Sequence, residues 1–116
     1  MGSFDEHRIQ RQIVEYLLMN RIEVFAIPNG GHRDVATAMV LKREGVRRGV
    51  ADLMIIGKNK IYFVEVKTKN GKQSEYQKNF EAIVNKSSVC EYMLWRSIDD
   101  AENFVLKHKN SLQLSD

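Results

Sequence analysis

Apolar residues at helical spacing mark four segments of the chain. In the first segment, the apolar residues from Ile9 to Leu18 fall on one face of a helix with 3.6 residues per turn. Residue types at the segment boundaries support helices, because Ser74 can cap a helix N-terminus and Gly45 can end a helix. The pattern predicts helices over residues 5–20, 34–44, 74–86 and 98–109.

Shorter apolar segments between these helices are typical of strands. Residues 50–56 are almost continuously apolar, which indicates a buried strand. Residues 61–67 alternate between two faces, as a strand does, and residues 57–60 between them have the composition of a hairpin turn. Further strands are expected over residues 23–27 and 90–95.

The order of these elements predicts an α/β fold in which a mixed central β-sheet is flanked by α-helices on both faces. The hairpin supplies an antiparallel pair of strands, and the helix at 74–86 is the crossover to a parallel neighbour. With 116 residues the chain has room for one domain. We place this domain at residues 4–110 and expect a frayed tail at residues 111–116.

Composition restricts the class of protein further. Apolar residues make up 43% of the chain and charged residues 28%, as in an ordinary globular protein. No apolar run approaches the roughly 20 residues that span a membrane. The single cysteine, Cys90, excludes an internal disulfide and a thiolate zinc site, so we expect a protein of the reducing cytoplasm.

Positive charge is concentrated in the middle of the chain. The net charge is +3, yet residues 58–78 alone hold six lysines against two acids, and residues 79–116 are net acidic. This distribution fits a surface that binds nucleic acid, and it fits a solvated lysine-rich loop equally well.

Three charged residues lie where the pattern predicts burial. Asp52 interrupts the apolar strand, and Glu65 and Lys67 lie on one face at the end of the following strand. Antiparallel pairing through the hairpin brings these side chains to one end of the sheet. Two neighbouring carboxylates repel each other and are costly to desolvate, and a divalent cation such as Mg²⁺ or Mn²⁺ relieves both costs. The alternative is a structural ion pair between Lys67 and one of the acids.

The motifs around these residues resemble a known nuclease signature. The segments "GVADL" and "FVEVK", joined by a hairpin, resemble the PD-(D/E)xK pattern. The wider stretch "KREGVRRGVADLMIIGKNKIYFVEVKTKNGKQSEYQKNF" and the N-terminal "DEHRIQRQIVEYL" are similar to the VRR-NUC branch of that superfamily, in a stand-alone form. The resemblance extends over residues 4–96. It departs from the family pattern at Ala51, where the family usually has a proline that shapes the backbone and does not bind metal.

The resemblance implies a restriction-endonuclease-like core and a role for each matching residue. Asp52 and Glu65 would be metal ligands, joined by the backbone carbonyl of Val66. Lys67 would position the attacking water.

Two residues outside the central strands also match the family. Gln77 would orient Lys67 or a bound water, and Glu6 would reach a second metal or its water shell. The alternatives are an exposed helix residue for Gln77 and, for Glu6, an acid favoured in a first helical turn by the helix dipole.

The resemblance also implies a function. We expect a Mg²⁺-dependent endonuclease, with Mn²⁺ able to substitute, that hydrolyses phosphodiester bonds in branched DNA, above all in four-way (Holliday) junctions. Stand-alone members are similar to junction resolvases, so we expect a homodimer without a membrane or small-molecule cofactor, in a bacterial or phage-infected cell. The alternatives are a flap or restriction-type nuclease on the same fold and a non-catalytic, basic DNA-binding module.

Overall fold

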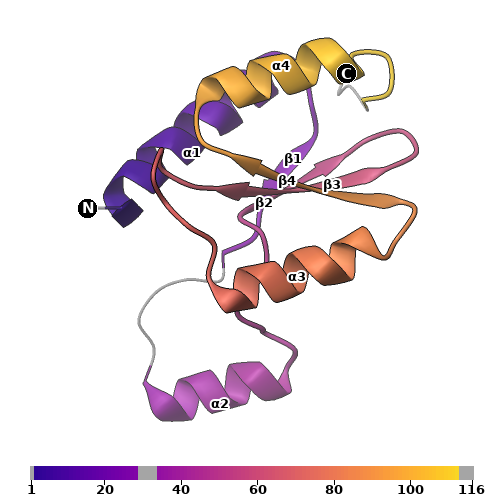
Figure 1. The fold of residues 1–116 in the computed structure, drawn as a ribbon. Helices are drawn as coiled ribbons and strands as arrows, with labels where there is room; N and C mark the ends of the chain where they lie inside the picture. Colours follow the sequence, from indigo (N-terminus) through magenta and orange to yellow (C-terminus); the bar gives the residue numbers. More distant parts are fainter. Residues whose placement is uncertain (1, 29–33, 113–116) are drawn as a thin grey trace.

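A computed structural model of the chain describes residues 2–28 and 34–112, and their side chains from residue 5 onward. The described residues form four helices and a four-stranded sheet (Figure 1). The elements are α1 (Gly2–Met19), β1 (Val24–Ala26), α2 (Val35–Arg43), β2 (Leu53–Ile56), β3 (Ile61–Val66), α3 (Glu75–Asn85), β4 (Cys90–Trp95) and α4 (Ile98–His108). Each lies in a segment whose hydrophobic pattern predicts it, although α1 begins earlier, at Gly2.

The sheet has the mixed topology that the element order predicts. Its strands follow the order β1-β2-β3-β4. The hairpin strands β2 and β3 pair antiparallel, with Leu53 opposite Val64, while β3 and β4 pair in parallel, with Val66 opposite Trp95. The parallel pair is joined by α3, which makes the crossover.

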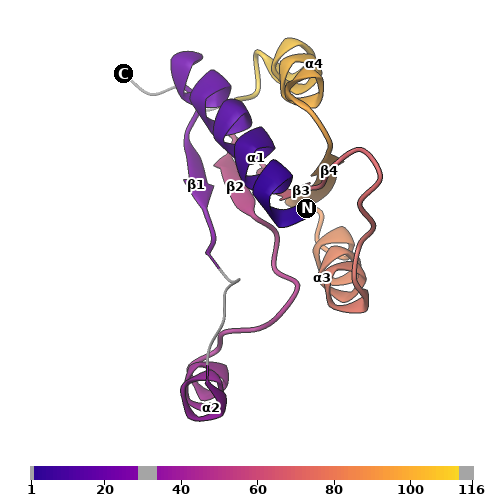
Figure 2. The ribbon, with the colours of Figure 1, turned by 90° about the vertical axis from the view of Figure 1, so that its left-hand side faces the viewer.

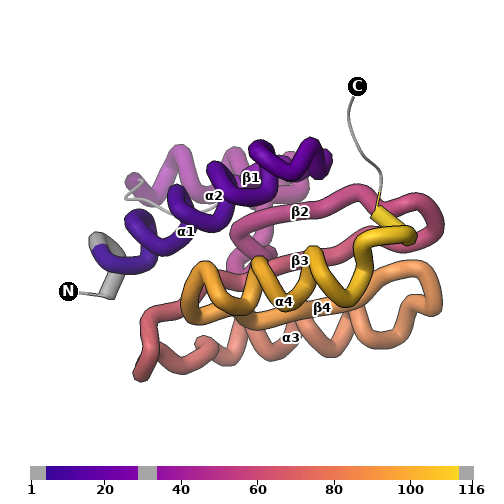
Figure 3. The backbone as a smooth tube through the Cα atoms, turned by 90° about the horizontal axis from the view of Figure 1, so that it is seen from above, coloured from indigo at the N-terminus to yellow at the C-terminus, as the bar shows by residue number. Residues whose placement is uncertain are grey.

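Helices cover both faces of this sheet. Figures 1 and 3 show α1 and α4 side by side on one face and α3 on the opposite face. The main core lies between the sheet and the α1–α4 layer, where the rings of Tyr62 and Phe104 meet edge to face at 4.9 Å. Full burial of each large apolar side chain there contributes about 1.5–3 kcal/mol, so this layer supplies most of the hydrophobic stabilisation. Its fully buried members include Ile13, Leu17, Leu53, Ile55 and Val64.

The helix α2 stands apart from the rest of the molecule. Figure 2 shows it well below the sheet and the other helices. Within the described chain it packs against no other helix or strand, and none of its residues is buried. The hydrophobic pattern therefore predicts the helix correctly but not its position outside the core.

Two sequence expectations are corrected at the ends of elements. The strand expected from residue 50 begins only at Leu53, because the side chain of Asp52 takes over a hydrogen bond of the β2–β3 ladder, as described below. The tail does not begin at residue 111: Leu112 is buried in the core, and the Ser111 carbonyl accepts a hydrogen bond of 2.9 Å from the Lys58 N–H. Residues 113–116 of the expected tail lie outside the described residues.

None of the helices in the described part of the chain is long and apolar enough to cross a membrane.

One glycine permits a close contact between the segment before β2 and the start of α3. Gly49 has a φ of +89°, and a Cβ at this position would lie 2.2 Å from the Tyr76 carbonyl oxygen. Backbone therefore lies directly against backbone, and no other residue fits without moving α3. Gly45 also has a positive φ, +102°, but nothing lies within 4 Å of its virtual Cβ.

These two glycines form a matched pair for a stability test. We expect Gly45→Ala to lower the free energy of unfolding by about 1–2 kcal/mol, the cost of a left-handed backbone at a residue with a Cβ. Gly49→Ala adds the clash with α3 and should cost at least about 2 kcal/mol more. Urea unfolding of both variants measures the difference, and equal losses would contradict the close contact.

Candidate active site

The candidate site lies where β2 begins and β3 ends. Because these strands are antiparallel, the residue before β2 faces the last residues of β3. The Val66 N–H donates a hydrogen bond of 2.8 Å to Asp52 Oδ2, a bond that a main-chain carbonyl would accept if the β2–β3 ladder continued. The Asp52 carboxylate is thereby fixed at one end of the sheet, bound to the residue that follows Glu65.

Glu65 is buried at the same end of the sheet, with 2% of its surface exposed. Its Oε2 accepts a hydrogen bond of 3.0 Å from the Gln77 amide. Its Oε1 is also buried and receives no hydrogen bond from any described residue. A buried acceptor without a donor is costly, which makes this oxygen the one that a proton or a cation can satisfy.

The Gln77 side chain is held from two directions. The side-chain oxygen of Gln77 accepts a hydrogen bond of 2.8 Å from the backbone N–H of Ser74. The backbone N–H of Gln77 donates in turn to Ser74 Oγ at 3.1 Å. This capping box fixes the first turn of α3 and leaves the side-chain NH₂ group to donate to Glu65. The resemblance assigns Gln77 to Lys67 or a water, whereas the structure shows its hydrogen bond going to Glu65.

The electrostatics of the site centre on Glu65. Burial is the largest effect that raises the pKa of Glu65, from 4.5 to about 9. The negative charge of Asp52 raises the pKa of Glu65 further, and the positive charge of Lys67 lowers it. With a pKa of about 9 and no cation bound, Glu65 keeps its proton at neutral pH.

Lys67 follows directly after β3, with only 9% of its surface exposed. Its N–H donates to the Trp95 carbonyl at 2.9 Å, which continues the parallel ladder beyond β3. In the described part of the chain, the salt bridges join Lys60 to Glu91 and Lys78 to Glu75, and none joins Lys67 to a carboxylate. The alternative of a structural ion pair at Lys67 is thus not what the structure contains.

Glu6 approaches the site from α1. It is half-buried, and its charge is among those that raise the pKa of Glu65. The structure thus brings the N-terminal part of α1 toward the carboxyl pair, on the face of the sheet opposite α3 (Figure 1).

The structure adds one residue that sequence reasoning missed. Arg96, directly after β4, donates from Nη1 to the carbonyls of Thr68 and Gly71, both at 2.7 Å. These bonds fix the loop that follows Lys67. No sequence signal marks this arginine, because its partners are backbone atoms about 25 residues away. The capping box, in contrast, is visible as the Ser-x-x-Gln spacing.

The carboxyl groups of Asp52 and Glu65 are the side-chain donors that this site offers to a metal ion. Across the residues that the structure describes, no group of three or more His, Cys, Asp or Glu side chains could hold a metal ion. The site offers two carboxyl groups beside a strand end. That set suits Mg²⁺, which binds one or two carboxylates and keeps several waters, and it does not suit zinc.

Comparison with known proteins identifies the fold. The chain is similar to a solved structure described as "VRR_NUC domain protein", with a TM-score of 0.71 and 18% identity over 88% of this chain and 85% of the other. A second structure, "VRR_NUC domain", matches with a TM-score of 0.59 and 22% identity over 89% and 95% of the two chains. No protein-family model matches the sequence, and no curated protein does. At these identities the likeness concerns the fold: the chain has the VRR_NUC fold, and the expected restriction-endonuclease-like α/β core is confirmed.

The raised pKa of Glu65 predicts how stability depends on pH. The unfolded chain releases this proton near pH 4.5, whereas the folded, metal-free protein keeps it up to about pH 9. The free energy of unfolding is therefore highest below pH 4.5. It falls as the pH rises from 4.5 to about 9, because only the unfolded chain gains from ionising Glu65 in this range. We expect Glu65→Gln to remove this decline, because the amide does not titrate.

Denaturant unfolding in EDTA across that pH range measures the effect. Glu102→Gln, which alters an exposed carboxylate on α4, is the matched control and should follow the wild type. Parallel profiles for the wild type and Glu65→Gln would contradict a buried carboxyl at this position.

Proposed function

We propose that this protein is a metal-dependent endonuclease that hydrolyses phosphodiester bonds in structured DNA, with four-way junctions as its main substrate. The observation that carries the proposal is the carboxyl pair of Asp52 and Glu65 at one sheet end, with a buried Glu65 oxygen that has no donor. The VRR_NUC fold supports it, as does the neighbouring Lys67, which forms no salt bridge with any described carboxylate.

In this proposal, the carboxylates of Asp52 and Glu65 and the backbone carbonyl of Val66 would hold Mg²⁺, with Mn²⁺ as a substitute. The unpartnered Glu65 Oε1 supports this assignment, since it needs a cation or a proton. When bound, the cation would polarise the phosphate and stabilise charge on the leaving oxygen. Glu6 would contribute to a second cation or to the surrounding water.

The remaining residues orient the reactants. Lys67 positions the attacking water and offsets negative charge on the phosphate, since its ammonium group has no carboxylate partner within the described chain. Gln77 acts through Glu65: its hydrogen bond holds Oε2 and leaves Oε1 without a donor, so that Oε1 would be free to bind a cation. Gln77 is therefore a positioning residue in this proposal.

Surface chemistry supports DNA as the substrate. The lysines of residues 58–78 supply phosphate contacts, which fix the position of DNA without reading its sequence. A four-way junction presents two symmetric strands, so a two-fold homodimer matches it. An exposed apolar side chain for such an interface occurs on α4, at Leu106.

The metal assignment predicts the effect of two isosteric changes. Asp52→Asn and Glu65→Gln each remove one anionic ligand and keep the side-chain volume, so the fold should persist while cleavage falls by about 100-fold or more. DNA binding should survive, because the phosphate contacts lie elsewhere. Near wild-type turnover in either purified variant would show that the metal assignment is wrong.

A cleavage panel tests the substrate. Labelled junction, flap, hairpin and linear duplex are incubated with Mg²⁺ or Mn²⁺, and light scattering gives the oligomeric state. We expect a dimer that cuts the junction fastest. A monomer that prefers flaps or linear duplex would overturn the junction proposal and leave the nuclease proposal standing, and binding without any cleavage would favour the non-catalytic alternative.

Lys67 has a distinct expected signature. Lys67→Ala should lose cleavage by about 100-fold or more, yet keep or gain Mn²⁺ affinity, because the ammonium group opposes a neighbouring cation. Lys67→Arg should restore little activity, since the planar guanidinium is no compact point charge. Calorimetric Mn²⁺ titration measures the affinity, with Lys69→Ala, at an exposed lysine two positions on, as the control. Clear loss of Mn²⁺ affinity in Lys67→Ala would instead indicate a lysine that holds the carboxylates in place.

A further inference from the structure

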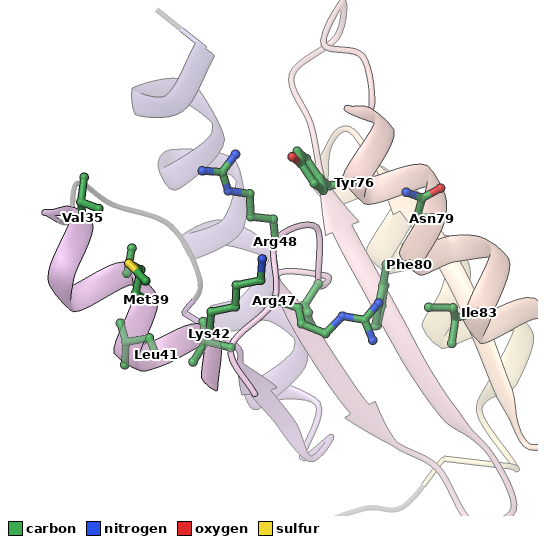
Figure 4. Close-up of a pocket in the computed structure, with 13 residues that line it drawn as sticks. Val35, Met39, Leu41, Lys42, Arg47, Arg48, Tyr76, Asn79, Phe80 and Ile83 are labelled. Carbon is green, nitrogen blue, oxygen red and sulfur yellow. The ribbon is translucent and has the colours of Figure 1, made fainter. Parts of the chain in front are cut away.

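A groove of about 840 Å³ separates α2 from α3, next to the carboxyl site and distinct from it (Figure 4). One wall is the face of α2 that carries Val35 and Met39, and the other is the outer surface of α3. The two sites share the first turn of α3, where Tyr76 lines the groove and the next residue, Gln77, binds Glu65.

The close contact at Gly49 fixes this groove beside the site. The backbone of Gly49 lies against that of Tyr76, so the segment between α2 and β2 is anchored at the start of α3. Beyond that anchor, α2 packs against no other element of the described chain. A helix of nine residues is marginal in water on its own, and no residue of the described part of the chain covers its apolar face enough to bury it. The groove is thus an open surface.

The charges on the groove favour an anionic occupant. Among the described residues that line it, the charged ones are Lys42, Arg47 and Arg48, and none is acidic. Figure 4 shows Lys42 and Arg48 reaching into the space between the two helices. A second copy of the chain, placed on a two-fold axis here, would bring the three cations against their own equivalents, which is unfavourable.

An exposed aromatic ring lies beside these cations. Tyr76 is 52% exposed, and the Arg48 guanidinium lies 5.3 Å from the centre of its ring. Sites for single-stranded nucleic acid combine cations that follow the backbone with aromatic rings on which unpaired bases stack. The bases of a duplex are already stacked on each other and cannot use such a ring.

We infer that this groove binds a single strand of DNA that leaves the duplex next to the carboxyl site. The strand's phosphates contact Lys42, Arg47 and Arg48, and a base stacks on Tyr76. The inference rests on the proposed function and deepens it, because it specifies that base pairs beside the branch point open on binding and that one unpaired strand enters the groove next to the scissile phosphate.

The test measures binding in EDTA, where no cleavage occurs, with the full chain. The probe is fluorescein-labelled oligo(dT) of about 15 nucleotides, and fluorescence anisotropy gives its Kd. Tyr76→Ala should raise the Kd at least about fivefold, and Tyr76→Phe, which keeps the ring, should bind like the wild type. Because Tyr76 is half-exposed, its replacement leaves the core intact.

The salt dependence of binding tests the two arginines of the groove. Arg47→Ala and Arg48→Ala should each weaken binding and reduce the slope of log Kd against log salt by about 0.7, the value for one phosphate contact on a single strand. Lys107→Ala removes one exposed cation from α4, on the opposite face of the sheet, and is the matched control. If the groove variants bind oligo(dT) with the Kd and salt slope of Lys107→Ala, the inference is wrong.

Met39→Asp separates DNA from a second copy as the occupant. An acid on the groove wall should weaken oligo(dT) binding and leave the oligomeric state unchanged in light scattering. Conversion of a dimer to a monomer with unchanged oligo(dT) affinity would assign the groove to a second copy and overturn the inference.

Cleavage assays with Mg²⁺ separate this inference from the proposed function. Groove-dependent oligo(dT) binding without cleavage of any DNA would support the groove and contradict the nuclease. Cleavage of branched DNA that is unchanged by the groove variants would support the nuclease and contradict the groove.

Discussion

The central constraint in this protein is the placement of two carboxyl groups, one of them buried, at one end of a β-sheet. Asp52 is held by the Val66 N–H, and Glu65 lies beside it with one oxygen that no described residue satisfies. Burial of Glu65 and, after it, the negative charge of Asp52 raise the pKa of Glu65 to about 9. An arrangement that costs stability without a proton or a cation is the kind of strain that functional sites retain.

The surrounding structure holds that arrangement in place. The hairpin register puts the start of β2 beside the end of β3, and the core packed beneath α1 and α4 fixes both strands. On the other face, the capping box at Ser74 directs Gln77 to Glu65. At Gly49 the segment before β2 contacts the backbone of the same helical turn. The first turn of α3 therefore positions residues of both the carboxyl site and the α2–α3 groove.

The fold could largely be predicted from the sequence because hydrophobic periodicity reports directly on helices and strands. The hairpin between β2 and β3 also predicted that Asp52 and Glu65 would meet. Three features depend on contacts between distant residues and escaped prediction. The pattern of α2 does not reveal that it stays outside the core, the apolar Leu112 did not look different from the tail around it, and Arg96 binds only backbone carbonyls.

Crystals soaked in Mn²⁺ and measured for anomalous scattering test the central claim, that the two carboxyl groups form a cation site. The account predicts an anomalous peak between Asp52 and Glu65, within about 2.0–2.4 Å of a carboxylate oxygen of each, that is lost in Asp52→Asn. Crystals of the wild type without a peak at this position, at Mn²⁺ concentrations that support DNA cleavage, would contradict it.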